Sequence, residues 1–359
     1  MSTVTSLPTF KPHFGVIVPT YNPGLEAWAK WVQALQLQNC KPMQVVVVDS
    51  GSTDGSLDLS QQAGFTLLHT KAQDFNHGAT RQWALNQGFF KSESSSAQSP
   101  TNSATPSTSP SASTPPDFIV FLTQDAILAK PNTLEELLHA FQDPQVAAAY
   151  GRQLPNQNAH WLEAHTRSFN YPDASKTVQL QDKASLGIKA CFLSNSFAAY
   201  RLQALMAQGG FPAHLPLGED TYTAAKLLLS GQSLRYQATA AVYHSHNYNN
   251  IQDFQRMFDT GVFHAQNPWL LQSFGKAEGE GLKLVRSQWS FLMAQSGQVN
   301  QPPVFQGVLQ WLTSNAFKWL GYKLGHVHRY LPTALVKKFS MHKAFWNTPA
   351  HASSGQSHP

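Results

Sequence analysis

Val45–Gly55 reads VVVVDSGSTDG, a run of β-branched residues followed by a polar, glycine-containing turn. Consecutive valines favour a strand over a helix, because β-branched side chains pack well on a pleated sheet. A short apolar run that ends in turn residues is typical of a buried strand. We therefore expect a strand at Gln44–Val48 and, after it, a loop from Asp49 that opens a short helix.

The same pattern of an apolar run and a polar loop recurs along the chain. Strands are expected at Phe14–Val18, Gln44–Val48, Phe65–His69, Phe118–Leu122, Val146–Tyr150 and Ala240–His244. Helices are expected at Gly78–Phe90, Pro131–Phe141, His160–Phe169, Ala198–Ala207 and Asp220–Leu229, and between the first two strands, where Leu25, Trp28, Val32 and Leu35 share one face.

Strands that alternate with helices imply right-handed βαβ units. The predicted fold is therefore α/β, with a Rossmann-like, mostly parallel sheet flanked by helices and a C-terminal helical extension. Ligands of such sheets bind beyond the carboxyl ends of the strands. The loops after Val18, Val48 and Leu122 should thus converge on one cleft.

The composition describes a globular chain, with 42% hydrophobic residues in 359. Cys40 and Cys191 have no close spacing, which argues against a disulfide framework or a thiolate metal site and suits a reducing compartment. The first residues show no secretory signal, and no apolar run reaches the ~18 residues of a spanning helix. We expect a cytoplasmic protein, either soluble or peripheral at the inner face of the cell membrane.

Charge is unevenly distributed. Residues 281–359 contain eight Lys and Arg and no Asp or Glu, whereas the whole chain carries +5, so the rest of the chain is net acidic. A basic, aromatic end suggests an anionic partner, either nucleic acid or a membrane surface. Apolar residues recur at helical spacing from Leu309 to Leu331. This pattern better suits an amphipathic helix on a membrane or one packed on the domain, and we expect no nucleic-acid partner.

The predicted domains are a catalytic unit at 11–250, a basic amphipathic helical region at 251–346 and a disordered tail at 347–359. The catalytic unit is interrupted at 91–116 by a Ser/Pro-rich tract (Ser92–Pro116) with almost no large apolar residue. Such a tract cannot offset the entropy of ordering, so we expect a disordered insertion.

Two aspartates follow predicted strands. Asp49 can accept a hydrogen bond from a nucleobase or ribose, or can serve as an ordinary turn residue. Asp125 can bind Mg²⁺ or Mn²⁺, which prefer carboxylate oxygen, or can be a plain loop carboxylate. His244 and His246 alternate after an apolar run, so both imidazoles could reach the same cation.

Glu219 and Asp220 precede an apolar helical pattern. Acids at a helix N-terminus are stabilised by its dipole, which is one interpretation. The other is a general base for an acceptor hydroxyl, with the neighbouring acid orienting a substrate.

Upstream, the polar segment Asp74–Arg81 opens a helix whose N–H groups could meet phosphate, with Arg81 adding a charged contact. No P-loop and no GxGxxG follows any strand, which counts against kinases and dehydrogenases.

Several motifs together resemble a known family. VIVPTYN (16–22), VVVDSGSTDG (46–55), the strand end at Asp125 and GED (218–220) resemble family-2 glycosyltransferases of the GT-A fold. DFNHGATR, FLTQDA, YGRQLP, FNYP, LGED, YHSHNY and, near the C-terminus, KKFSMHKAFW are similar to the bacterial rhamnosyltransferase branch.

The resemblance implies inversion at the anomeric carbon of a nucleotide sugar, by single displacement, with a divalent metal. It implies that Asp220, beside Glu219, is the catalytic base. The donor site is implied to comprise Pro19, Tyr21, Asn22, Asp49, Arg81 and Gln124, and the metal site Asp125, His244 and His246. Thr123 stands where the family has the first acid of its Asp-x-Asp motif, so the metal has one carboxylate fewer.

The same branch implies dTDP-L-rhamnose as donor and a polysaccharide or lipid-linked glycan as acceptor. A non-catalytic protein that binds nucleotide sugars or glycans is the alternative, and Thr123 favours it. The intact Gly218–Asp220 cluster argues for an enzyme.

Overall fold

The computed structural model describes residues 10–89, 115–275, 278–294 and 303–347. Its strands are β1 (Phe14–Thr20), β2 (Gln44–Asp49), β3 (Thr66–His69), β4 (Phe118–Leu122), β5 (Ile127–Leu128), β6 (Val146–Leu154), β7 (Lys176–Val178), β8 (Phe197–Arg201) and β9 (Ser233–Tyr243). The α-helices are α1 (Leu25–Gln36), α2 (Ser56–Gln62), α3 (His77–Phe89), α4 (Thr133–Leu138), α5 (Trp161–Asn170), α6 (Lys183–Leu186), α7 (Leu202–Ala207), α8 (Glu219–Leu229), α9 (Asn250–Gln266), α10 (Pro268–Phe274), α11 (Glu278–Ala294), α12 (Val304–His326) and α13 (Thr333–Phe339).

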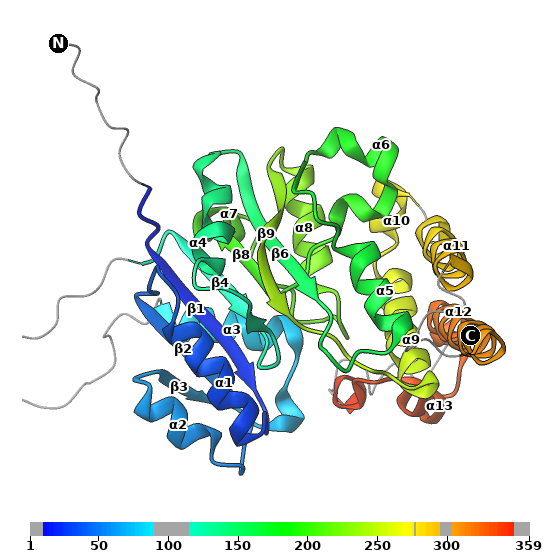
Figure 1. Ribbon diagram of the computed structural model, residues 1–359, viewed down its shortest axis with the longest axis horizontal. Helices are drawn as coiled ribbons and strands as arrows, with labels where there is room; N and C mark the ends of the chain where they lie inside the picture. Colours follow the sequence, from blue (N-terminus) through cyan, green and yellow to red (C-terminus); the bar gives the residue numbers. More distant parts are fainter. Residues whose placement is uncertain (1–9, 90–114, 276–277, 295–302, 348–359) are drawn as a thin grey trace, which may run out of the picture.

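One mixed sheet organises the N-terminal part of the chain, up to Tyr243, with strand order β3-β2-β1-β4-β8-β6-β9-β5 and β7 paired to β9. In Figure 1 the strands β1 to β3 lie at one side of the molecule and the C-terminal helices at the other, with β6 and β9 between them. The four N-terminal strands are parallel neighbours, with Val18 opposite Val47 and Val47 opposite Leu67. The predicted α/β class with a mostly parallel sheet is confirmed.

The valine run is buried throughout because helices cover both faces of the sheet. Val46 and Val48 pack in the cluster that contains Leu85 of α3. Val45 and Val47 point the other way, into the cluster that contains Trp28 of α1. Alternate side chains of a strand face opposite sides, so a strand between two helical layers is apolar at every position.

Two predictions about local structure were wrong. Ala198–Arg201, expected within a helix at Ala198–Ala207, belong to the antiparallel strand β8, and α7 begins only at Leu202. Phe197 and Ala199 pack in one hydrophobic core, and Ala198 and Tyr200 pack in the other. This alternation of faces is not visible in the sequence, because these four residues are all apolar.

Leu25 was expected on the buried face of α1. Its side chain is 52% exposed, and Trp31 takes its place among the buried residues of this helix. Trp31 stacks on Trp28 at a centroid distance of 4.6 Å and joins Trp28, Val32 and Leu35, which are buried as expected.

The C-terminal helices attach to the sheet domain through α9. Helix α12 lies along α9, where a Cβ added at Gly325 would meet the Phe258 carbonyl oxygen at 1.9 Å and one at Gly321 would meet that of Phe254 at 2.3 Å. The two backbones thus approach closely through glycine. The opposite side of α12 therefore faces away from the domain.

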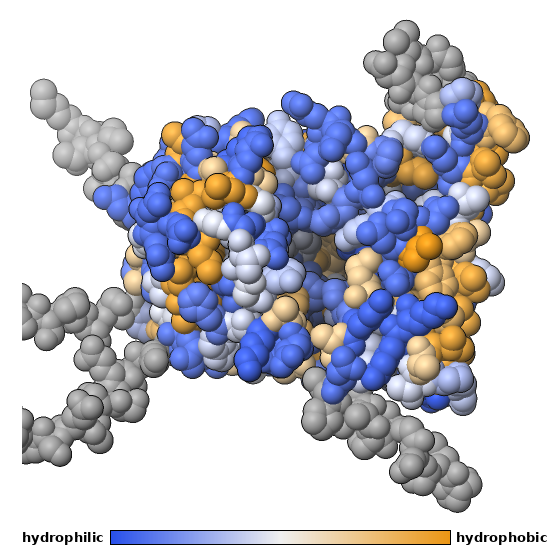
Figure 2. All heavy atoms as spheres, turned by 90° about the horizontal axis from the view of Figure 1, so that it is seen from below, coloured by the Kyte–Doolittle hydropathy of each residue, from blue (hydrophilic) through white to orange (hydrophobic). Residues whose placement is uncertain are grey.

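That outer side is apolar. Phe305 is 78% exposed, Leu309 and Leu312 are each 52% exposed, and Trp319 is 62% exposed. The stripe expected at Leu309–Leu331 is thus divided: Leu309, Leu312, Leu320 and Val327 are exposed, whereas Leu324 and Leu331 pack against the buried cluster that contains Phe258. Figure 2 shows hydrophobic residues gathered on the side of α11 and α12, next to a hollow near the middle of the face. Within the described residues, no helix is both long and apolar enough to cross a bilayer.

The predicted insertion and tail fall mostly outside the described part of the chain, since 90–114 and 348–359 are not described. Helix α3 and strand β4 flank the insertion. The described residues from 250 to 347 form helices and their connections.

Candidate functional site

The loops after β1, β2 and β4 meet, as predicted. The backbone N–H of Tyr21 donates to Gln124 Oε1 at 2.7 Å, and Gln124 Nε2 donates to the Tyr21 carbonyl at 3.2 Å. Asn22 connects the first loop to the second, because its N–H donates to Ser52 Oγ and its Oδ1 accepts from the Thr53 N–H, each at 2.8 Å. Pro19 is buried beneath this platform, while the Tyr21 side chain is 53% exposed.

Asp49 holds the second loop. Its Oδ2 accepts from the N–H groups of Gly51 and Ser52 at 2.8 and 2.9 Å, and its Oδ1 accepts from Ser52 Oγ at 2.5 Å and Thr20 Oγ1 at 3.3 Å. The side chain is 1% exposed. This geometry is that of a turn-stabilising aspartate, the simpler of the two interpretations.

Asp125, His244 and His246 come together after β4 and β9. Their candidate ligand atoms lie within 4.8 Å of one another, and each carboxylate oxygen of Asp125 is 3.4 Å from one imidazole Nε2. Burial alone would raise the pKa of Asp125. The neighbouring imidazoles of His244 and His246 outweigh burial and hold this pKa well below its usual range. Burial and neighbouring His244 lower the pKa of His246 to about 4, so its ring is neutral at physiological pH.

These three side chains suit a divalent cation. His244 Nδ1 lies 2.9 Å from Gln153 Oε1, which accepts its proton and leaves Nε2 free toward Asp125. One carboxylate and two imidazoles are ligands that Mn²⁺, Zn²⁺ or Fe²⁺ accepts, with open positions for a substrate. Both histidines lie in the loop after β9, not on the strand as their alternation suggested.

A cavity of about 550 Å³ lies beside this triad. Glu219 and Asp220 form one wall, and Asp125, His244 and His246 lie in another. Gly218 sits immediately before α8 with φ +81°, a conformation that favours glycine and turns both acids toward the cavity. Of the predicted donor residues, Arg81 lines this cavity, whereas Pro19, Tyr21, Asn22, Asp49 and Gln124 belong to the neighbouring platform.

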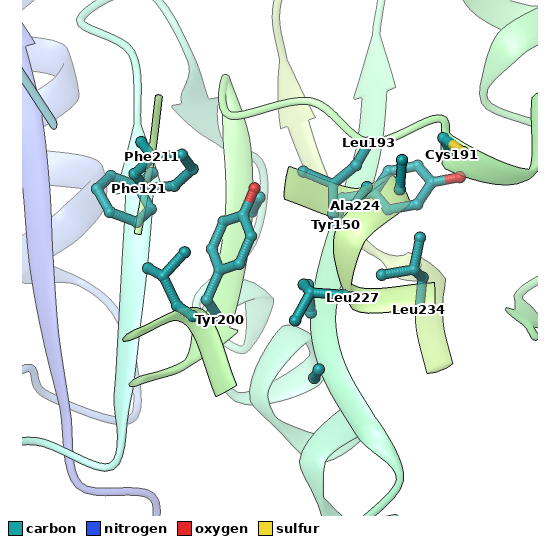
Figure 3. Packing of buried hydrophobic residues seen from close by; sticks show 14 of the residues in the cluster. Phe121, Tyr150, Cys191, Leu193, Tyr200, Phe211, Ala224, Leu227 and Leu234 are labelled. Atoms are coloured by element: carbon teal, nitrogen blue, oxygen red, sulfur yellow. The ribbon is translucent and has the colours of Figure 1, made fainter. Parts of the chain in front are cut away.

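Glu219 is committed to a buried ion pair. Its Oε1 lies 3.0 Å from Arg81 Nη1 and accepts from Asn195 Nδ2 at 3.0 Å, with both charged side chains under 10% exposed. Asn195 Oδ1 in turn accepts from the Tyr200 hydroxyl at 2.8 Å. Figure 3 shows Tyr200 between the Phe121–Phe211 pair and the group around Leu227. The ion pair is thus anchored in the hydrophobic core.

Asp220 faces the cavity without a cationic partner at hydrogen-bond distance among the described residues. Its oxygens accept from the Thr221 N–H at 2.7 Å, from the Asn195 N–H at 3.2 Å and, at 3.4 Å, from the Thr221 hydroxyl. Burial and the negative charge of Glu219 raise the pKa of Asp220, against the lowering effect of these hydrogen bonds and of Arg81. A carboxylate with a raised pKa beside an open cavity is suited to accept a proton.

The C-terminal segment closes the cavity, and no residue of it was predicted as part of the site. Asp259 Oδ2 accepts from the N–H groups of Met341 at 2.9 Å and His342 at 3.2 Å, so α9 fixes this segment. The His342 ring lies edge-on to His77 at 4.8 Å, and both line the cavity. The KKFSMHKAFW motif was the signal in the sequence, because it resembles the same family although it begins 117 positions after the end of GED.

A family model described as "Glycosyltransferase like family 2" matches residues 12–259. The chain belongs to glycosyltransferase-like family 2. The expected enzyme class and family are confirmed.

Among curated relatives of this glycosyltransferase, the O-antigen chain rhamnosyltransferase WbaN of Salmonella anatum is 43% identical over 96% of this chain and 98% of its own. The O-antigen chain rhamnosyltransferase RfbN of Salmonella typhimurium is 40% identical over 94% of this chain and 98% of its own. Among solved structures, the mannosyltransferase PcManGT of Pyrobaculum calidifontis, in complex with GDP-Man and Mn²⁺, has a TM-score of 0.54 at 18% identity, covering 89% of this chain and 88% of the other. That likeness supports the GT-A fold.

Proposed function

We propose that this glycosyltransferase transfers L-rhamnose from dTDP-L-rhamnose to a hydroxyl of a growing O-antigen or other lipid-linked glycan, with inversion at the anomeric carbon. The relatives named as O-antigen chain rhamnosyltransferases support the sugar and the kind of product. The observation that carries the chemistry is Asp220, a carboxylate of raised pKa on the wall of the cavity that also holds Asp125.

Asp220 accepts the proton of the acceptor hydroxyl as that oxygen attacks the anomeric carbon. The bond to the nucleoside diphosphate breaks on the opposite side of the sugar, which inverts the anomeric configuration. Glu219 does not accept this proton, because its carboxylate is held in the ion pair with Arg81. It acts instead by positioning α8 and by holding the pKa of Asp220 up.

The platform of Tyr21, Asn22, Asp49 and Gln124 is the proposed nucleoside side of the donor site. Its outward groups are the exposed Tyr21 ring and the loop that Asp49 fixes. Arg81, proposed from the sequence as a phosphate contact, contributes by neutralising Glu219.

Asp125, His244 and His246 would hold Mg²⁺ or Mn²⁺, which when bound neutralises the charge of the departing diphosphate. Gln153 keeps His244 in the tautomer that leaves Nε2 free. Because Thr123 stands in place of an acid, the affinity for the metal depends on the two imidazoles as well as on Asp125.

We expect EDTA to abolish transfer and His244→Ala to raise the metal concentration needed for half-maximal rate by about 10-fold or more.

The outer side of α12 is the proposed membrane contact, at the inner face of the cell membrane. Its exposed apolar residues lie in the part of the chain that holds eight cations and no acids, a combination that matches an anionic lipid surface. Residues 11–250 would then form the catalytic unit and 251–346 the part that meets the membrane.

The donor assignment is tested by a panel of dTDP-L-rhamnose, UDP-glucose, UDP-galactose and GDP-mannose. We expect dTDP-L-rhamnose alone to be consumed with Mn²⁺ present, by transfer or by slow hydrolysis, and to raise Tm most. Preference for another donor would overturn the sugar assignment. Binding without consumption would favour the alternative of a silent nucleotide-sugar-binding protein.

A further inference from the structure

A second cavity of about 180 Å³ adjoins the first. His246 and Tyr248 line both, and their rings stack at a centroid distance of 5.1 Å. Since His246 also faces Asp125 at 3.4 Å, the second cavity lies one aromatic ring away from the candidate metal site. Its other walls come from α5, the start of α9 and α12.

The charges in these walls are already balanced. Asp253 is paired with Lys318 at 3.3 Å and accepts from Ser314 Oγ at 3.0 Å. Glu163 is paired with Arg167 at 2.6 Å. Among the described residues that line the cavity, an anion such as a phosphate finds no unpaired Lys or Arg, so the cavity suits a neutral ligand.

The remaining groups suit hydroxyls. Gln310 Oε1 accepts from Trp161 Nε1 at 2.9 Å, and within the described chain its Nε2 has no hydrogen-bond partner. Asn250 adds an amide to the lining, and Thr313 adds a hydroxyl whose proton is donated to the Leu309 carbonyl at 2.8 Å, so that its oxygen can accept from a ligand. Amides and hydroxyls both donate and accept, as sugar hydroxyls do. The volume corresponds to about six water molecules at ~30 Å³ each, the scale of one sugar ring.

The position matches an extended acceptor. Gln310 and Thr313 line the cavity, while their neighbours Leu309 and Leu312 lie on the exposed apolar side of α12. A glycan attached to a lipid at that side would pass this cavity before reaching Asp220.

We propose that the second cavity is an acceptor subsite, which binds the saccharide unit next to the unit that receives the new sugar. The proposal rests on the proposed function and deepens it. It predicts that the enzyme distinguishes a disaccharide acceptor from a monosaccharide by contacts with Gln310 and Thr313.

The test compares wild type with the double variant Gln310→Ala/Thr313→Ala, and uses Gln306→Ala, on the same helix outside the cavity, as control. The probes are phenyl glycosides of galactose, glucose, mannose and rhamnose and of their disaccharides, titrated by tryptophan fluorescence. We expect the double variant to weaken the best disaccharide by about tenfold, as the loss of two ordinary hydrogen bonds would, and to leave monosaccharides unchanged. Gln306→Ala should behave as wild type.

Kinetics supply a second readout. The double variant should raise KM for the disaccharide acceptor while KM for the donor and its hydrolysis by water stay unchanged. Unchanged disaccharide binding, an equal loss for monosaccharides, or failure of every disaccharide to bind wild type would overturn the subsite. Failure of the proposed function looks different, since donor hydrolysis would then be absent from wild type and all variants alike.

Discussion

The ionised form of Asp220 lowers the free energy of unfolding, because this carboxyl group is buried beside Glu219. Burial and Glu219 raise its pKa in the folded protein, whereas in the unfolded chain the value is about 3.9. Between those two values the folded state binds more protons than the unfolded state. The contribution of Asp220 to stability is therefore complete below pH ~3.9 and is lost as pH rises through the folded pKa.

This difference predicts that Asp220→Asn stabilises the protein near neutral pH. The amide needs no ionisation, so Tm should rise by a few degrees at pH 7.5, at ~1–2 °C per kcal/mol for 359 residues. The gain should shrink toward acid pH, where Asp220 is protonated in both states. Thermal unfolding at several pH values measures this, and a lower Tm of the variant at pH 7.5 would contradict the environment described for Asp220.

The same raised pKa predicts the pH dependence of transfer. The acid limb of kcat/KM should lie above the range of an ordinary aspartate, because Asp220 must be ionised to accept a proton. Glu219→Gln removes the neighbouring negative charge, so the limb should move to lower pH even if the rate falls. A limb that moves to higher pH, or stays in place, would show that Glu219 does not set the pKa of the base.

At the scale of elements, the contact between α9 and α12 depends on glycine. A Cβ at Gly325 would meet the Phe258 carbonyl oxygen at 1.9 Å, whereas one at Gly281 in α11 meets nothing within 4 Å. Gly325→Ala must push the helices apart and should cost about 1–3 kcal/mol. Gly281→Ala should be neutral or slightly stabilising, because alanine is the better helix former. Urea unfolding compares the two, and equal stability of both variants would argue against close packing.

Periodicity explains which elements could be predicted. The parallel strands were visible because apolar runs such as Val45–Val48 end in turn residues. Phe197–Arg201 was mistaken for helix, since an apolar strand covered on both faces shows no alternation. Strand β9 begins at Ser233, seven residues before the predicted Ala240, because polar residues such as Arg235 and Gln237 interrupt its apolar pattern.

At the scale of the molecule, the basic C-terminal part and the apolar side of α12 predict binding to anionic vesicles. The triple variant Phe305→Ser/Leu309→Ser/Leu312→Ser removes exposed groups only, so folding should be kept while vesicle binding is lost. Binding of wild type should also weaken when the salt concentration rises from 0.1 M to 0.5 M, because the Debye screening length falls from ~10 Å to ~4 Å. Co-sedimentation with phosphatidylglycerol vesicles measures both, and equal binding by the triple variant would exclude α12 as the contact.

Short motifs mark the residues that the fold brings to one cavity. The candidate metal ligands Asp125, His244 and His246 lie in loops, and Glu219 and Asp220 lie in the first turn of α8, all at positions that the family resemblance marks. Partnerships across the chain could not be read from sequence. Arg81 pairs with Glu219 across 138 positions, and Asp259 fixes His342 through backbone N–H groups, which no side-chain motif records.

The most direct test is transfer from dTDP-L-rhamnose to a lipid-linked glycan acceptor by wild type and by Asp220→Asn, with dTDP affinity measured in parallel. Removing the base should lower kcat by roughly 10²-fold or more, while dTDP binds both proteins equally and the variant remains folded. The account predicts that combination. Turnover by Asp220→Asn at the wild-type rate would contradict it, because the proton of the acceptor would then be accepted by a different group.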